Sequence, residues 1–175
     1  MQIETTNVSQ SGYYNDNYTI VAYASRFGGS KRVAKIIATV LRERFFLKVD
    51  LINIKKINGQ LDLDKYKHVI FGSGIAGDEW TKAGKEFLTQ DFSKKKLAIF
   101  VTSGNAGTAL KEQNREEYLK WQNRYISDVI KPFNLQPISV KAFGGQLPSI
   151  GRKLYNTLDD ERVVKWAEEL GQLLT

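Results

Sequence analysis

The stretch Tyr18–Ser30, YTIVAYASRFGGS, carries the pattern on which the fold prediction depends. Its first part, Tyr18–Ala24, is short and mostly apolar, as is typical of a β-strand covered on both faces. Gly28 and Gly29 follow, and a helix is predicted from about Ser30 to Arg44. The apolar residues of that helix recur at the spacing of one face: Val33, Ile36, Ile37, Val40 and Leu41. A buried strand, a glycine turn and an amphipathic helix together predict the first unit of a parallel sheet.

The rest of the chain continues this alternation of strands and helices. Four more strands are predicted, at Leu47–Ile54, Tyr66–Gly72, Leu97–Val101 and Pro137–Phe143. Helices are predicted around Trp80–Leu88, over 108–131 with Pro132 at the end, and from Asp159 or Asp160 onward. Residues 55–65 show no helical period. This order predicts an α/β domain with five parallel strands and helices on both faces.

Length and composition fit one globular domain. The chain has 175 residues, of which 42% are hydrophobic and 26% charged. We expect residues 1–17, which are rich in polar side chains, to form a flexible tail, and residues 18–175 to form the domain. The absence of cysteine and the single histidine exclude disulfides, thiolate metal sites and histidine dyads. No signal peptide or membrane span is visible, so the expected location is the cytoplasm.

The charge of the chain is strongly positive. Lys and Arg number 26 against 19 Asp and Glu, which gives a net charge of +7. Such a surface favours an anionic partner, such as a phosphate, a carboxylated substrate, nucleic acid or an acidic lipid. A basic surface that serves only solubility explains the charge equally well.

Small residues and glycines follow the strands at the edge where a parallel sheet binds ligands. These segments are 25–30, 72–77, 102–107 and Gly144-Gly145. Ligands bind beyond the carboxyl ends of the strands, at the point where the strand order reverses. Several such segments at neighbouring strand ends predict one large, flat ligand lying against the backbone.

The first of these segments has the features of a phosphate site. It leads directly into a helix, whose free N–H groups and partial positive charge suit a phosphate, and Ser25, Arg26 and Ser30 add donors. The alternative is an ordinary turn in which Ser30 caps the helix. Other phosphate motifs fit less well. Gly29-Ser30-Lys31 lacks P-loop spacing, and the G-x-G-x-x-G match at 72–77 is followed by a strand that ends in Thr102-Ser103 without an acid for a ribose.

The segment 25–30 resembles the phosphate loop S/T-x-T-G-x-T of flavodoxin-like proteins. Ser25, Gly28 and Ser30 match that pattern, whereas Phe27 stands in place of the usual threonine. Tyr23–Ala34 is more similar still to the flavodoxin-domain branch that includes menaquinone-dependent protoporphyrinogen dehydrogenases. Further resemblance lies in Val69–Leu88, Ala98–Gly104 and Ala142–Gly145. The resemblance implies a flavodoxin-like three-layer sandwich with strand order 2-1-3-4-5.

The same resemblance implies FMN as cofactor and a set of residues that hold it. The phosphate would be held by Ser25, Arg26, Phe27, Gly28, Gly29 and Ser30. One edge of the flavin would be lined by Ser73, Gly74, Ile75 and Ala76, and its pyrimidine side by Thr102, Ser103, Gly104, Asn105 and Gly107. Trp80 either covers a face of the flavin or packs at the start of a helix. Trp121 and Tyr125 are assigned to a helix stripe, His68 receives no role, and no catalytic or metal-binding residue is assigned.

Three classes of function follow from these patterns. The first is an FMN-dependent oxidoreductase acting on a small organic donor or acceptor, such as a porphyrinogen or a quinone. The second is a flavodoxin-type carrier between redox proteins, against which the charge of +7 counts because such carriers are typically acidic. The third is a module that binds nucleic acid or makes peripheral contact with a membrane. Charge alone supports it, and no nucleic-acid signature is present.

Overall fold

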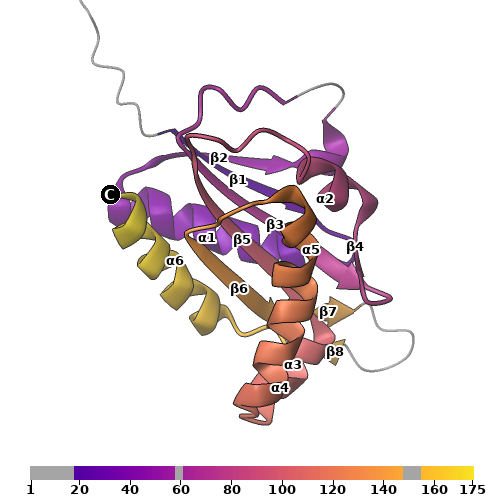
Figure 1. Cartoon of the computed structure of the whole chain (residues 1–175). Helices are drawn as coiled ribbons and strands as arrows, with labels where there is room; N and C mark the ends of the chain where they lie inside the picture. Colours follow the sequence, from indigo (N-terminus) through magenta and orange to yellow (C-terminus); the bar gives the residue numbers. More distant parts are fainter. Residues whose placement is uncertain (1–17, 58–60, 148–154) are drawn as a thin grey trace, which may run out of the picture.

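A computed structural model describes residues 18–57, 61–147 and 155–175. The predicted tail, residues 1–17, lies outside the described residues. The main sheet is parallel and runs in the order β2-β1-β3-β5-β6 (Figure 1). Its strands are β1 (Tyr18–Ala24), β2 (Lys48–Asn53), β3 (His68–Ala76), β5 (Lys96–Ser103) and β6 (Ser139–Gly144). Without the short strand β4 (Glu79–Trp80) this is the order 2-1-3-4-5, which confirms the predicted fold class.

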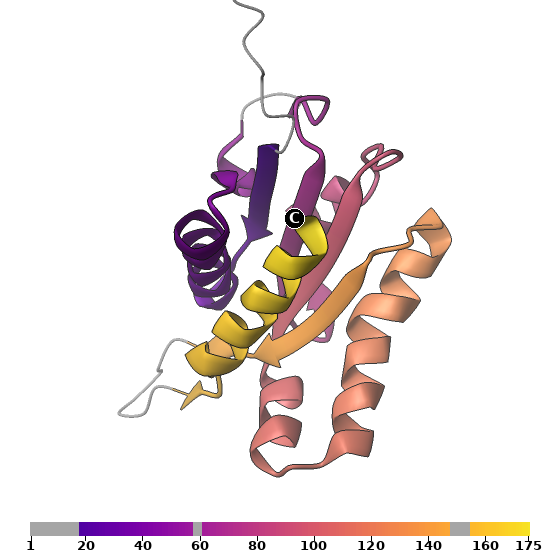
Figure 2. The ribbon, with the colours of Figure 1, turned by 90° about the vertical axis from the view of Figure 1, so that its left-hand side faces the viewer.

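Helices cover both faces of the sheet, as Figures 1 and 2 show. One face carries α1 (Gly29–Phe45) and α6 (Asp160–Leu174). The other face carries α2 (Lys82–Phe87), α3 (Gly104–Lys111), α4 (Arg115–Gln122), a π-helical turn (Asn123–Ser127) and α5 (Asp128–Ile130). Short 3-10 turns at Ile54–Lys56 and Lys131–Phe133 and a two-stranded sheet of β7 (Gln146–Leu147) and β8 (Tyr155–Asn156) complete the described part. No helix in the described residues is both long and apolar enough to cross a membrane.

The core under α1 and α6 forces one close approach between strands. Phe100 and Phe143 pack edge-on against Trp166, which is 2% exposed. The ring of Phe100 lies over Gly72 of β3, where an added Cβ would come within 2.1 Å of it. Gly72 is therefore required by packing on this face, and a side chain there would displace the aromatic cluster.

The open edge of the sheet is closed by side chains rather than by another strand. β6 is the last strand, and its Ala142 has an N–H and a carbonyl directed away from β5. Gln122 Oε1 accepts from the Ala142 N–H at 3.3 Å, and the Tyr118 hydroxyl donates to the Ala142 carbonyl at 3.1 Å. At Ala142, α4 thus satisfies the outward backbone groups of an edge that would otherwise be open to another chain.

The structure corrects the end of the strand predicted at Tyr66–Gly72 and the start of the helix predicted around Trp80–Leu88. The segment 72–77 is mostly strand, because β3 continues to Ala76 and turns back into β4 through Gly77 and Asp78, which both have positive φ. Trp80 therefore lies in a strand, and α2 begins only at Lys82, where Thr81 caps it. A two-residue turn with both φ values positive is the usual connection of a tight hairpin.

The predicted helix over 108–131 is divided into several parts. Its first residues belong to α3, which ends at Lys111. Gln113 then has a φ of +54°, and the Asn114 side chain caps α4 by accepting from Glu117 N–H. The period of Tyr118, Trp121 and Tyr125 continues through α4 into the π-helical turn. The sequence shows no helical period in residues 55–65. In the structure, the first two of these residues belong to a short 3-10 turn, Ile54–Lys56, which the Asn53 side chain caps.

A buried histidine makes the stability of this fold depend on pH. His68 opens β3, is 4% exposed, and its Nδ1 lies 3.0 Å from Thr19 Oγ1 on the neighbouring strand. Burial, aided by the charges of Lys96 and Lys67, lowers the pKa of His68 to about 4. The imidazole is therefore neutral in the folded protein at pH values where the unfolded chain already binds a proton.

We predict that this histidine reduces stability as the pH falls from about 6.5 toward 4. The unfolded state binds more protons in that range, so the free energy of unfolding decreases, by at most roughly 3 kcal/mol. Denaturant unfolding of the native protein and of His68→Gln, measured across this range, isolates the effect from carboxylates that titrate in both. Parallel curves for the two proteins would show that His68 does not contribute.

Candidate functional site

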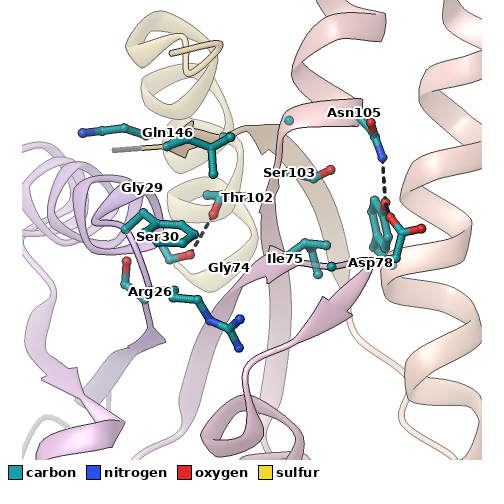
Figure 3. A pocket seen from close by; sticks show the side chains of 17 residues that line it. Arg26, Gly29, Ser30, Gly74, Ile75, Asp78, Thr102, Ser103, Asn105 and Gln146 are labelled. Atoms are coloured by element: carbon teal, nitrogen blue, oxygen red, sulfur yellow. Dashed lines mark hydrogen bonds between the residues drawn. The ribbon is translucent and has the colours of Figure 1, made fainter. Parts of the chain in front are cut away.

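A cleft of about 190 Å³ lies at the carboxyl ends of the central strands (Figure 3). Its walls come from the segment after β1, the end of β3, the end of β5 with the start of α3, and the segment after β6. Between β1 and β3 the strand order reverses, which is where open parallel sheets bind ligands. The cleft brings together these predicted residues: Ser25, Arg26, Phe27, Gly29, Ser30, Gly74, Ile75, Thr102, Ser103, Gly104 and Asn105.

The start of α1 supplies an electropositive end of the cleft. Gly28 has a φ of +91° and caps the helix without a side-chain bond, and its N–H donates to Ser25 Oγ at 2.9 Å. The first turn of α1 contains no acidic residue. Lys55 Nζ donates to the Ser25 carbonyl at 3.0 Å, and the Arg26 side chain is exposed at the same loop. This end therefore suits an anion, because it offers free helix N–H groups and two cations. The first helix turn holds no carboxylate that would compete for them.

A hydrogen-bonded pair of hydroxyls forms the floor between the first loop and β5. Ser30 Oγ and Thr102 Oγ1 lie 2.8 Å apart, and Figure 3 shows the two side chains pointing toward each other. A Cβ on Gly74 would come within 3.4 Å of Ser30 Oγ and 3.7 Å of Thr102 Oγ1. A Cβ there would be in ordinary van der Waals contact with both hydroxyls, so Gly74 leaves unfilled the place where three segments of the chain meet.

The opposite end of the cleft is built around Tyr125. The Tyr125 hydroxyl donates to Asp78 Oδ1 at 2.5 Å and accepts from Asn105 Nδ2 at 2.9 Å. Its backbone carbonyl accepts from Trp80 Nε1 at 2.6 Å, and its ring stacks on Trp121 with centroids 5.5 Å apart. Burial and the bond to Asp78 raise the pKa of Tyr125, so its hydroxyl remains a donor at neutral pH. One residue thus joins the β3–β4 hairpin, the start of α3 and the π-helical turn.

Tyr125, Asp78, Gln146 and Leu147 line the cleft but were not predicted as site residues. Gly77 and Gly145 also line it, and both lie in the glycine segments that the sequence analysis identified. The assignment of Tyr125 to a helix stripe alone is corrected, because helical spacing does not distinguish a core contact from a cleft contact. Gly77-Asp78 between two strand segments was a hairpin signal that could have identified Asp78.

Some predicted residues lie outside the cleft lining: Gly28, Ser73, Ala76, Trp80 and Gly107. Trp80 is 3% exposed and packs against Phe71, because its place in β4 directs it into the core. Its position therefore corrects the expectation that it covers the ligand and fits the packing alternative. The Ser73 side chain is buried and bonded to Thr81, and Gly107 is pressed against Thr157. Gly28 caps the start of α1 with a positive φ, and Ala76 is the last residue of β3.

We predict that Tyr125→Phe loosens the β3–β4 hairpin without unfolding the protein. The substitution removes the bonds to Asp78 and Asn105, each worth about 0.5–1.5 kcal/mol. Amide hydrogen exchange at residues 77–80 should therefore accelerate. Tyr118→Phe is the matched control, because it removes a bonded hydroxyl from the same helical segment outside the cleft. Equal exchange of the hairpin in the two variants would contradict the role of Tyr125.

Comparison with known proteins places this chain in a family. The family model described as "Flavodoxin domain" matches residues 20–157. No curated protein matches the chain. Among solved structures, oxidised flavodoxin 1 from Bacillus cereus is similar with a TM-score of 0.62 and 18% identity, over 91% of this chain and 100% of that one. Flavodoxin 2 from Bacillus cereus has a TM-score of 0.55 and 22% identity, over 90% of this chain and 99% of that one.

A larger enzyme contains the same fold as one part. Rubredoxin oxygen:oxidoreductase from Desulfovibrio gigas is similar with a TM-score of 0.58 and 15% identity, over 90% of this chain. This chain spans only 36% of the length of that protein. The structural likenesses show the shared fold, and the family model covers most of the sequence. The chain belongs to the flavodoxin-domain family.

Proposed function

We propose that the protein binds FMN noncovalently in this cleft and uses it to transfer electrons. The observation that carries the proposal is the juxtaposition, in one cleft, of a helix start suited to an anion and a floor that Gly74 leaves unfilled. FMN, when bound, supplies reversible electron transfer, and the protein supplies binding, orientation and electrostatics.

The phosphate end fits the donors that the chain presents. The Ser25 hydroxyl accepts from Gly28 N–H, and its own proton stays free to donate to a ligand. In the pair of Ser30 and Thr102, one hydroxyl donates to the other, which leaves one hydroxyl proton for a phosphate oxygen. Arg26 supplies a charge where Phe27 replaces the hydroxyl that the family motif usually has.

The other end of the cleft offers groups suited to the edge of a flat polar ring. Asn105 and the Asp78 carboxylate provide a donor and an acceptor beside Tyr125, and Gly74 and Ile75 provide backbone and an apolar contact. A cleft of about 190 Å³ is smaller than the roughly 300–1,000 Å³ of sites that enclose a drug-sized ligand. Part of the ring would therefore stay at the surface, where a redox partner can approach it.

We favour the role of electron carrier between redox proteins. Its support is the likeness to flavodoxins 1 and 2, which the chain covers along essentially their whole length. A second candidate is an oxidoreductase that acts on a small organic molecule, such as a porphyrinogen or a quinone. The net charge of +7 favours this second candidate when the molecule carries carboxylates.

We predict that the native protein binds FMN in a one-to-one ratio and riboflavin, which lacks the phosphate, much more weakly. In Ser25→Ala/Ser30→Ala the affinity for FMN should fall by about ten- to a hundredfold per lost charge-assisted bond, with little change for riboflavin. Titration calorimetry of the apoprotein measures both ligands. Ser93→Ala, which removes a hydroxyl outside the cleft lining, is the control. Equal affinity for FMN and riboflavin would mean that the loop is only a turn.

The salt dependence of electron transfer separates the two candidate roles. For a carrier, reoxidation of the reduced protein by an acidic redox protein should slow steeply as salt rises, because exposed charges are screened over about 10 Å at 0.1 M. Stopped-flow measurements with such a protein, a quinone and a porphyrinogen at several salt concentrations make the comparison. Turnover of only the porphyrinogen or quinone, with no reaction with the protein partner, would favour the oxidoreductase.

A further inference from the structure

A second cavity, of about 310 Å³, lies beside the edge strand β6. Figure 2 shows β6 running between α6 and the α3–α4 pair, and residues from all four elements line the cavity. It shares no lining residue with the FMN cleft. Its volume falls within the range of small-molecule sites, about 300–1,000 Å³.

Cations from three separate elements line this cavity. Arg115 comes from α4, Lys141 from β6 and Arg162 from α6, and no carboxylate is among the described lining residues. Arg162 Nε lies 3.4 Å from Asp159 Oδ2, and both side chains are half exposed. In the part of the chain that the structure describes, no carboxylate lies within ion-pair distance of Arg115 or Lys141. Among the described residues, Arg115 and Lys141 therefore bring to the cavity positive charge that no carboxylate pairs with, and Arg162 brings a cation that Asp159 contacts.

Protection of the sheet edge does not account for Lys141. Lysines on edge strands commonly prevent pairing with another chain. Here Tyr118 and Gln122 already occupy the hydrogen-bonding groups of Ala142, next to Lys141 on the same strand. Lys141 is partly buried and has no ion-pair partner among the described residues, so its ammonium group is available to an anionic ligand.

The cations adjoin apolar lining residues. The partly buried Leu110 and Tyr118 contribute the apolar surface, and the Tyr118 hydroxyl is bonded to the protein. Phe143 also lines the cavity but is only 1% exposed, because its ring packs in the core against Trp166. A ligand that matches this combination needs both a negative group and an apolar body. Inorganic anions satisfy only the first requirement, and neutral aromatics only the second.

We propose that this cavity binds a small organic anion, with its carboxylate, sulfonate or phosphate group at Lys141 and Arg162 and its apolar body against Leu110 and the ring of Tyr118. The site is separate from the FMN cleft and does not depend on the proposed redox function. Anion binding there is also a role for part of the excess positive charge of the chain.

A pair of probes with the same aromatic body tests the proposal. The full chain should bind 1-anilinonaphthalene-8-sulfonate, measured by titration calorimetry, equally well without FMN and with one equivalent of FMN. N-phenyl-1-naphthylamine, which lacks the sulfonate, should bind at least about tenfold more weakly, because it makes no charge-assisted bond. Equal binding of both probes, or displacement of 1-anilinonaphthalene-8-sulfonate by FMN, would overturn the proposal.

Matched variants assign the binding to the cations. Lys141→Gln/Arg162→Gln should reduce sulfonate affinity by at least about tenfold, whereas Lys165→Gln, an exposed position on α6 outside the cavity, should leave it unchanged. Lys141→Arg/Arg162→Lys keeps both charges and should retain binding, which separates loss of charge from loss of folding. Unchanged affinity in the double glutamine variant, or equal losses in all three variants, would refute the site.

Discussion

The unpaired backbone N–H groups at the start of α1 are the constraint on which the rest of the site depends. A helix leaves its first N–H groups without internal partners, and their partial positive charge lies where β1 ends at the middle of the sheet. Burial of β1 between β2 and β3 places that helix start at the point where the strand order reverses. Gly28, in the left-handed region, leads the chain into the helix, and no acidic side chain of the first turn competes for the N–H groups.

The remainder of the cleft makes its two ends differ in charge. Arg26 and Lys55 make one end positive, and Asp78, held by Tyr125 and paired with Arg124 at 3.1 Å, places a carboxylate at the other. A ligand with a phosphate at one end and hydrogen-bonding ring edges at the other matches this polarity in only one orientation. Tyr125 maintains that geometry, because its bonds join the π-helical turn to the β3–β4 hairpin and to the start of α3.

The parts that the sequence predicted are those in which one local pattern determines the structure. Apolar runs followed by small residues identified the strands and their order in the chain, and the Ser25–Ser30 motif identified one wall of the cleft, where we propose that a phosphate binds. The sequence predicts an end of the third strand at Gly72, whereas in the structure β3 continues to Ala76 and pairs with β4, because glycines do not prevent the backbone pairing there. Tyr125 and the cationic cavity were not predicted, because their contacts join segments that are distant in sequence.

The ionisation of the bound phosphate tests the central claim most directly. A free phosphate monoester loses its second proton with a pKa near 6. Held by helix N–H groups and Arg26, the phosphate of FMN should remain a dianion, because these donors favour the charged form. Its ³¹P resonance should then stay constant from about pH 5 to pH 8. A resonance that titrates like that of free FMN would show that the start of α1 does not hold the phosphate.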